Sequence, residues 1–86
     1  MKLNPFAIMS EQFDGTGLIF DPNTNAAMSV NKSGVYLWTR IKEGATEDEM
    51  AAGLLERFSG VTKEQAAADV KAFLQELRNR SLLSED

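Results

Sequence analysis

The first third of the chain alternates short apolar runs with turn-forming residues. Apolar runs at residues 6–9 and 18–20 flank an Asp14-Gly15 pair, and a third run follows the polar turn at residues 21–25. An Asp-Gly pair between two apolar runs is a hairpin signal. The pattern predicts a three-stranded antiparallel meander within about residues 6–31.

After Asn31, which is a suitable N-cap, the apolar residues recur at spacings of three and four. This period is typical of amphipathic helices. Two later helix starts carry the capping-box pattern, Thr46 with Glu49 and Thr62 with Gln65. The pattern predicts three helices, over about residues 32–43, 47–58 and 63–80. Strands followed by helices indicate the α+β class.

The length of 86 residues suits one domain, so we expect a single domain over residues 1–86. Hydrophobic residues make up 43% and charged residues 26% of the chain, as in ordinary globular domains. The chain has no cysteine and no histidine, which removes disulfides, thiolate nucleophiles, Cys/His zinc sites and imidazole acid–base catalysis. We therefore expect no catalytic residue, no cofactor and no metal.

An acidic cluster at Glu47, Asp48 and Glu49 is the one group of carboxylates that could suggest a metal or an acid–base pair. Its position at a predicted helix start already explains it, because carboxylates stabilise helix N-termini. A catalytic role for this cluster is not expected.

The net charge of −4 argues against nucleic acid as a partner, since non-specific affinity for nucleic acid comes from Lys and Arg that neutralise phosphates. No uncharged stretch approaches the roughly 20 residues that span a bilayer, and the N-terminus lacks the apolar run of a signal peptide. A cytoplasmic location without membrane contact is the default expectation.

Three groups of residues follow one another in a recognisable order and spacing over about residues 13–83. They are Val30-Asn31 before Gly34-Val35-Tyr36-Leu37-Trp38, the run Glu43-Gly44-Ala45-Thr46-Glu47-Asp48-Glu49, and Asp69-Val70, Phe73-Leu74, Leu77 and Leu82-Leu83. Together these residues resemble the PqqD-like family, named after pyrroloquinoline quinone biosynthesis protein D.

The resemblance implies a winged helix-turn-helix-like fold that acts as a recognition element for ribosomally made, post-translationally modified peptides. The leader segment of a precursor peptide becomes a fourth strand beside the third, against the last helix. The domain presents that peptide to a modifying enzyme, commonly a radical S-adenosylmethionine protein. One residue departs from the family pattern: Ser81 stands where the family often has glycine, and it would be strained if that position needs a positive φ.

The sequence itself offers an edge strand for such pairing. The third predicted strand has no Lys, Pro or inward charge to protect its edge, and an unprotected edge can pair with another chain. On the last helix, one flank beside the core stripe supplies a wall for the guest. The predicted peptide-binding residues are Ala26, Ala27, Met28, Ser29, Val30, Ala67, Lys71, Leu74 and Arg78.

Two alternatives of other classes remain open. The second and third predicted helices, joined by a short turn at residues 59–61, could form the helix-turn-helix of a winged-helix DNA-binding protein. The same edge strand could instead pair across a two-fold axis in a homodimeric interaction module.

Overall fold

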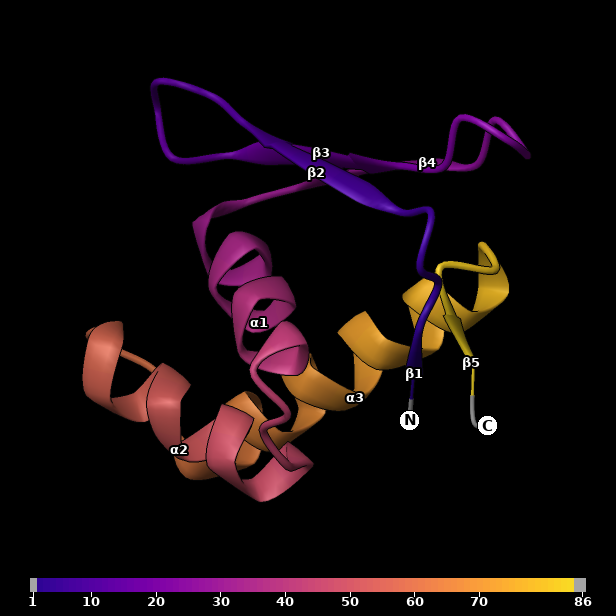
Figure 1. The fold of residues 1–86 in the computed structure, drawn as a ribbon. Helices are drawn as coiled ribbons and strands as arrows, with labels where there is room; N and C mark the ends of the chain where they lie inside the picture. Colours follow the sequence, from indigo (N-terminus) through magenta and orange to yellow (C-terminus); the bar gives the residue numbers. More distant parts are fainter. Residues whose placement is uncertain (1, 85–86) are drawn as a thin grey trace.

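The chain folds as a small antiparallel sheet that lies over three helices (Figure 1). The structure is a computed structural model, and it describes residues 2–84. The elements follow in the order β1 (Lys2–Leu3), β2 (Ile8–Glu11), β3 (Gly17–Phe20), β4 (Ala27–Val30), α1 (Lys32–Lys42), α2 (Glu47–Arg57), α3 (Lys63–Asn79) and β5 (Leu83–Ser84). The predicted α+β class is confirmed, with a three-stranded meander followed by three helices in a winged-helix-like arrangement.

The main sheet has the strand order β2-β3-β4, and its two faces differ in chemistry. Met9, Ile19 and Met28 lie opposite one another across the three strands. Ile19 is completely buried, and the two methionines are half-buried against the core. Successive side chains of a strand point to opposite faces, so this row marks the face that rests on the helices.

Strand β2, the first strand of the predicted meander, begins later than the apolar pattern indicated. Phe6, which the pattern placed in the strand, is 60% exposed and lies in a turn before β2. Asn4 holds that turn, because its side-chain oxygen accepts the Phe6 N–H at 2.9 Å and its backbone carbonyl accepts the Ala7 N–H at 3.0 Å. The predicted hairpin is present, and Gly15 takes a φ of +89° in its five-residue loop.

A second, two-stranded sheet joins the two ends of the described chain and was not predicted. Lys2 pairs with Ser84 and Leu3 with Leu83, antiparallel. Leu82 and Leu83, which follow the end of α3, are buried. These leucines fill the core beside the end of α3, and that burial brings the N-terminal residues into pairing distance.

The three helices follow the predicted boundaries closely, and their caps explain where they begin. The Asn31 side chain accepts the Gly34 N–H at 2.9 Å at the start of α1. Thr46 and Glu49 form the complete capping box of α2. At α3 only half of the predicted box is formed, with the Thr62 hydroxyl accepting the Gln65 N–H at 3.1 Å.

The core lies between the sheet and the helices and continues between α2 and α3. It is built mainly from apolar residues of all three helices and the last two leucines. Its buried members are Ile19, Val30, Leu37, Trp38, Ile41, Ala45, Met50, Leu54, Ala66, Val70, Leu74, Leu77, Leu82 and Leu83. None of the helices in residues 2–84 is both long and apolar enough to cross a membrane.

Gly34 fixes how closely α1 approaches β4. A Cβ atom at position 34 would lie 2.7 Å from the Val30 Cβ and 3.4 Å from a ring carbon of Phe73. Real Cβ atoms do not come that close to another carbon, so only glycine permits this packing. The start of α1 therefore sits directly on the end of β4 and next to α3.

Candidate functional site

Strand β4 is an edge of the main sheet, because it pairs with β3 on one side only. In an antiparallel pair, residues alternate between those that bond to the partner strand and those whose N–H and C=O point the other way. The Asp21 N–H donates to the Ala26 carbonyl at 2.9 Å, so the backbone of Ala26 faces the chain of the neighbouring strand β3. Because the bonding alternates along the strand, the N–H and C=O groups of Ala27 and Ser29 point away from β3, toward the open side of β4. We call this direction outward.

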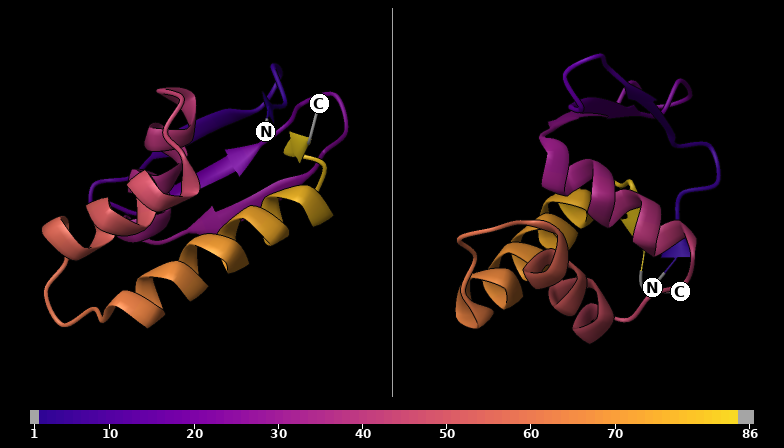
Figure 2. Two further views of the ribbon diagram at one scale, coloured as in Figure 1. Left: turned by 90° about the horizontal axis from the view of Figure 1, so that it is seen from below. Right: turned by 90° about the vertical axis from the view of Figure 1, so that its left-hand side faces the viewer.

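Strand β4 and helix α3 lie side by side in Figure 2. Two adjoining hollows run between these two elements along the edge of the sheet. The larger, of about 560 Å³, is lined by Gln12, Thr16, Gly17, Met28, Ser29, Val30, Asn31, Gly34 and Phe73. The smaller, of about 430 Å³, is lined by Leu18, Ala27, Met28, Ser29, Glu76 and Arg80. Met28 and Ser29 line both hollows, so the two form one groove along β4, which we call the β4 groove.

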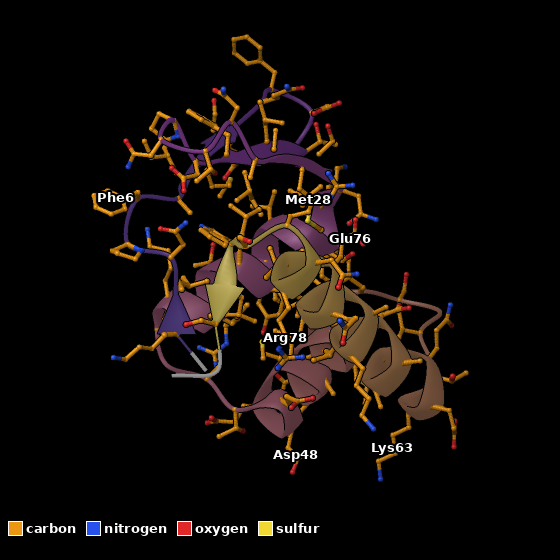
Figure 3. All side chains as sticks on the ribbon, turned by 90° about the vertical axis from the view of Figure 1, so that its right-hand side faces the viewer. Phe6, Met28, Asp48, Lys63, Glu76 and Arg78 are labelled. Carbon is orange, nitrogen blue, oxygen red and sulfur yellow. The ribbon has the colours of Figure 1, made fainter. Side chains whose placement is uncertain are left out.

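The helix side of the β4 groove consists of Phe73, Glu76 and Arg80. Residues three and four positions apart share one face of a helix, so these three form a row along α3. Figure 3 shows Met28 and Glu76 close to each other at this side of the molecule. The groove thus has an uncharged end near Phe73 and a charged end near Arg80.

At the charged end, Arg80 makes two hydrogen bonds that connect α3 to the strand. Its Nη1 donates to the Ala27 carbonyl at 2.7 Å, and its Nε donates to a Glu76 carboxylate oxygen at 2.7 Å. The Ala27 carbonyl is one of the outward-pointing edge groups. One acceptor of the open edge is therefore already occupied by a side chain of α3.

The turn after α3 holds Arg80 in this position. Ser81 has a φ of +60°, and the Ser81 and Leu82 N–H groups donate to the carbonyls of Arg78 at 3.1 Å and Leu77 at 2.8 Å. This pair of bonds is the Schellman motif, whose left-handed position is usually glycine. The positive φ considered for Ser81 is thus present, and the motif fixes Arg80 as the C-cap residue.

The structure places the predicted strand residues in two groups. Ala27 and Ser29 are exposed and direct their backbone groups outward, whereas Met28 and Val30 point toward the helices. Ala26 precedes β4 and is half-buried. Four of the five predicted strand residues line the β4 groove, and Ala26 does not.

The predicted helix residues lie on other faces of α3. Ala67 lines a separate hollow of about 470 Å³ between α2 and α3. Leu74 is only 1% exposed and belongs to the core, Lys71 is exposed, and Arg78 is half-buried. None of these four residues lines the β4 groove. Sequence reasoning thus chose the flank of the core stripe opposite the one that carries Phe73, Glu76 and Arg80.

The carboxylates with shifted pKa values belong to turns and caps. The Thr16 hydroxyl lowers the pKa of Asp14, the Asn23 backbone N–H lowers that of Asp21, and the Thr46 backbone N–H lowers that of Glu49. A general acid at neutral pH needs a raised carboxyl pKa, and these three shifts have the opposite sign. Within residues 2–84, no cluster of three or more acidic side chains could hold a metal ion.

Comparisons with known proteins agree with this architecture. Residues 17–83 match the family model of PqqD, described as coenzyme PQQ synthesis protein D, which confirms the resemblance noted in the sequence. No curated protein sequence matches the chain.

Two solved structures have a similar fold. The structure of TbiB1 in complex with the TbiA(beta) leader peptide has a TM-score of 0.86 and 21% identity, covering 100% of this chain and 98% of that one. The structure of lasso peptide synthetase B1 complexed with the leader peptide has a TM-score of 0.77 and 18% identity, covering 91% of this chain and 89% of that one.

Proposed function

This chain belongs to the PqqD family, and we propose that it is a non-catalytic domain that binds the leader segment of a ribosomally made precursor peptide and presents it to a modifying enzyme. The leader lies as an additional strand beside β4, in the β4 groove. The observation that carries this proposal is the outward-facing backbone of Ser29, which adjoins the larger, uncharged hollow on the same edge.

Both proteins with the similar fold are described in complex with a leader peptide. Strand addition is a general mode of peptide recognition in which main-chain bonds hold the guest and pockets select its side chains. The β4 edge and the hollow beside Phe73 provide both parts of that mode. These observations together favour leader capture over other roles.

Magnitudes indicate that side chains, more than the backbone, supply the affinity. Ser29 and the flanking outward groups provide about two or three ladder hydrogen bonds, at a net ~1 kcal/mol each. Ordering five guest residues costs about 1–2 kcal/mol per residue. Each apolar guest side chain that is well buried contributes about 1.5–3 kcal/mol. Binding therefore requires at least two or three apolar guest residues in the β4 groove.

Phe73 takes the place of Leu74 as the proposed apolar contact on α3. Leu74 is 1% exposed, so a guest could reach it only if the core opened. Phe73 is half-buried, packs against the core and lines the larger hollow together with Met28. On the strand, we retain Ala27, Met28, Ser29 and Val30 as the peptide-binding residues.

The two alternatives have less support. As a DNA-recognition helix, α3 would bring Glu64, Asp69 and Glu76 toward the phosphates, which weakens the electrostatic attraction on which such binding depends. A homodimer would use the same β4 edge, whereas both proteins with the similar fold are described in complex with a leader peptide. The absence of catalysis, the single domain and the cytoplasmic location are parts of the proposal.

The proposed function is tested with a fluorescein-labelled leader, the N-terminal segment of the short precursor peptide that we expect to be encoded beside the gene for this chain. We expect saturable 1:1 binding by fluorescence anisotropy, and a monomeric free protein by sedimentation. A labelled scrambled leader is the control. No binding at high micromolar protein, or a salt-dependent shift of duplex DNA in its place, would overturn the proposal.

A further inference from the structure

Arg80 occupies a position that leader capture alone does not explain. It is the C-cap residue of α3, yet its Nη1 bonds to the Ala27 carbonyl on the open side of β4, at 2.7 Å. Edge strands in soluble proteins are commonly protected by a charged side chain of their own. Here β4 carries no charge between Ala27 and Val30, and the cation comes from the neighbouring helix.

The Arg80 bond is stronger than the bond that a guest backbone could offer in exchange. A hydrogen bond from a charged guanidinium is roughly twice as strong as one between neutral groups. A guest residue opposite Ala27 would have to place its own N–H at the carbonyl that Arg80 already holds. Pairing at Ala27 therefore replaces a stronger bond with a weaker one and also requires the guanidinium to move.

Two further contacts hold Arg80 in place. Its Nε bonds to Glu76 at 2.7 Å, and its backbone N–H donates to the Glu76 carbonyl at 3.1 Å. The next residue, Ser81, begins the turn that buries Leu82. Displacing Arg80 from Ala27 thus requires both hydrogen bonds of its guanidinium to be lost or rearranged.

At the other end of β4 the edge is closed as well. The Asn31 carbonyl accepts the Val35 N–H at 3.0 Å, because Asn31 is the N-cap of α1. Among the described residues of this edge, Ser29 is left with both its N–H and its C=O directed outward and unoccupied. A guest strand has only a short window centred on this residue.

We propose that Arg80 is a specificity-determining residue that ends the pairing edge of β4 and so fixes the register of the guest strand. The inference rests on the proposed function, since it concerns the same groove. A guest strand pairs at Ser29 and does not continue to Ala27. The guest residue that follows this pair turns away from the sheet, over the smaller hollow.

The test uses amide hydrogen exchange of the full chain, free and saturated with the labelled leader described above. In the wild-type complex, we expect protection of the Ser29 amide to rise and that of the Ala27 amide to stay unchanged. In Arg80→Met, which keeps an apolar stem but has no donor, both amides should gain protection. The leader should then bind about fivefold more tightly, as one more backbone hydrogen bond implies.

Lys71→Met is the matched control, because it removes the same charge from an exposed position of α3 outside the β4 groove. It should leave affinity and both amides as in the wild type. If Arg80→Met folds poorly, Arg80→Ala serves as the second variant, since a C-cap position does not depend on its side chain.

The outcomes separate the two proposals. Equal protection of the Ala27 amide in the wild type and in Arg80→Met, whether high or low, would overturn the role of Arg80 while leaving leader capture intact. If the Ser29 amide gains no protection in any complex, pairing at β4 fails, and the role of Arg80 fails with it.

Discussion

Replacing Ser29 with proline removes one outward-facing hydrogen-bond donor from the β4 edge. Proline has no N–H, and its ring occupies the space where a partner carbonyl would approach. The Ser29 N–H points away from β3, so the ladder between β3 and β4 keeps its bonds. Proline is tolerated in edge strands at such outward positions, and we expect Ser29→Pro to fold.

The expected loss of affinity follows from one hydrogen bond and the group that it leaves behind. A neutral backbone hydrogen bond contributes a net ~1 kcal/mol, and a guest carbonyl left without a donor costs about 1–3 kcal/mol. The lower end of this sum, about 2 kcal/mol, raises the dissociation constant roughly 30-fold, and we expect at least that loss of affinity. Ser29→Ala keeps the N–H and should bind within about twofold of the wild type.

The opposite edge of the sheet supplies a second control. The Gln12 N–H donates to the Thr16 carbonyl at 2.7 Å, so by alternation the backbone of Glu11 points outward from β2. Glu11→Pro therefore removes one outward-facing N–H from the other edge of the sheet and should leave leader binding unchanged. Fluorescence anisotropy with the labelled leader measures affinity, and circular dichroism checks the fold. Loss of binding in Glu11→Pro with normal binding in Ser29→Pro would refute the choice of β4.

Three further predictions concern the apolar contact, the C-terminal turn and pH. Phe73→Ala should weaken leader binding about tenfold or more, because a guest side chain loses an aromatic surface in the larger hollow; titration of the variant by anisotropy measures this. Ser81→Gly should raise the free energy of unfolding in urea by about 0.5–1 kcal/mol, because the φ of +60° is strained for serine and free for glycine. The pKa of Asp21 is lowered, chiefly by the Asn23 backbone N–H, so its stabilising effect is complete above the ordinary carboxyl pKa of about 4 and is lost as pH falls below it. Urea titrations between neutral and acidic pH should show this decline, and Asp21→Asn should reduce it.

Each of these predictions has a result that contradicts it. Unchanged affinity in Phe73→Ala would show that the leader does not contact that ring, provided that circular dichroism shows an intact fold. A less stable Ser81→Gly would mean that the serine side chain contributes more than its backbone strain costs. For Asp21, an acid-induced decline of equal size in the wild type and in Asp21→Asn would assign the pH dependence to other carboxylates.

The sequence was sufficient for the elements that local chemistry specifies. Thr46 and Glu49 define the start of α2 through their own side chains, and Gly15 supplies the positive φ of the first hairpin. The helical period placed Leu77 in the core, where it is fully buried. Such features depend on a few neighbouring residues and can therefore be predicted without coordinates.

The features that were missed depend on contacts between distant segments. The pairing of Leu3 with Leu83 joins residues from the two ends of the chain, and no local pattern indicates it. The turn around Asn4 depends partly on the Asp21 carboxylate, which accepts the Asn4 side-chain amide at 2.7 Å. Such long-range contacts decide where β2 begins.

The sequence indicated the edge strand that borders the β4 groove, but not the side of α3 that faces it. The β4 edge follows from the strand order, which the meander pattern already implied. To predict the helix side of the groove, one must know which flank of α3 lies beside β4. The helical period of the apolar residues does not distinguish the two flanks. Phe73 and Arg80 lie on the flank that faces β4, whereas Ala67 faces α2. Only the packing of the sheet on the helices distinguishes them.

The most direct measurement is a set of intermolecular nuclear Overhauser effects between the isotope-labelled full chain and its unlabelled leader. The account predicts cross-strand contacts from the leader backbone centred on Ser29, without pairing at Ala27, and side-chain contacts to the Phe73 ring. Leader contacts along Ile8–Glu11, or in the hollow between α2 and α3, would contradict it.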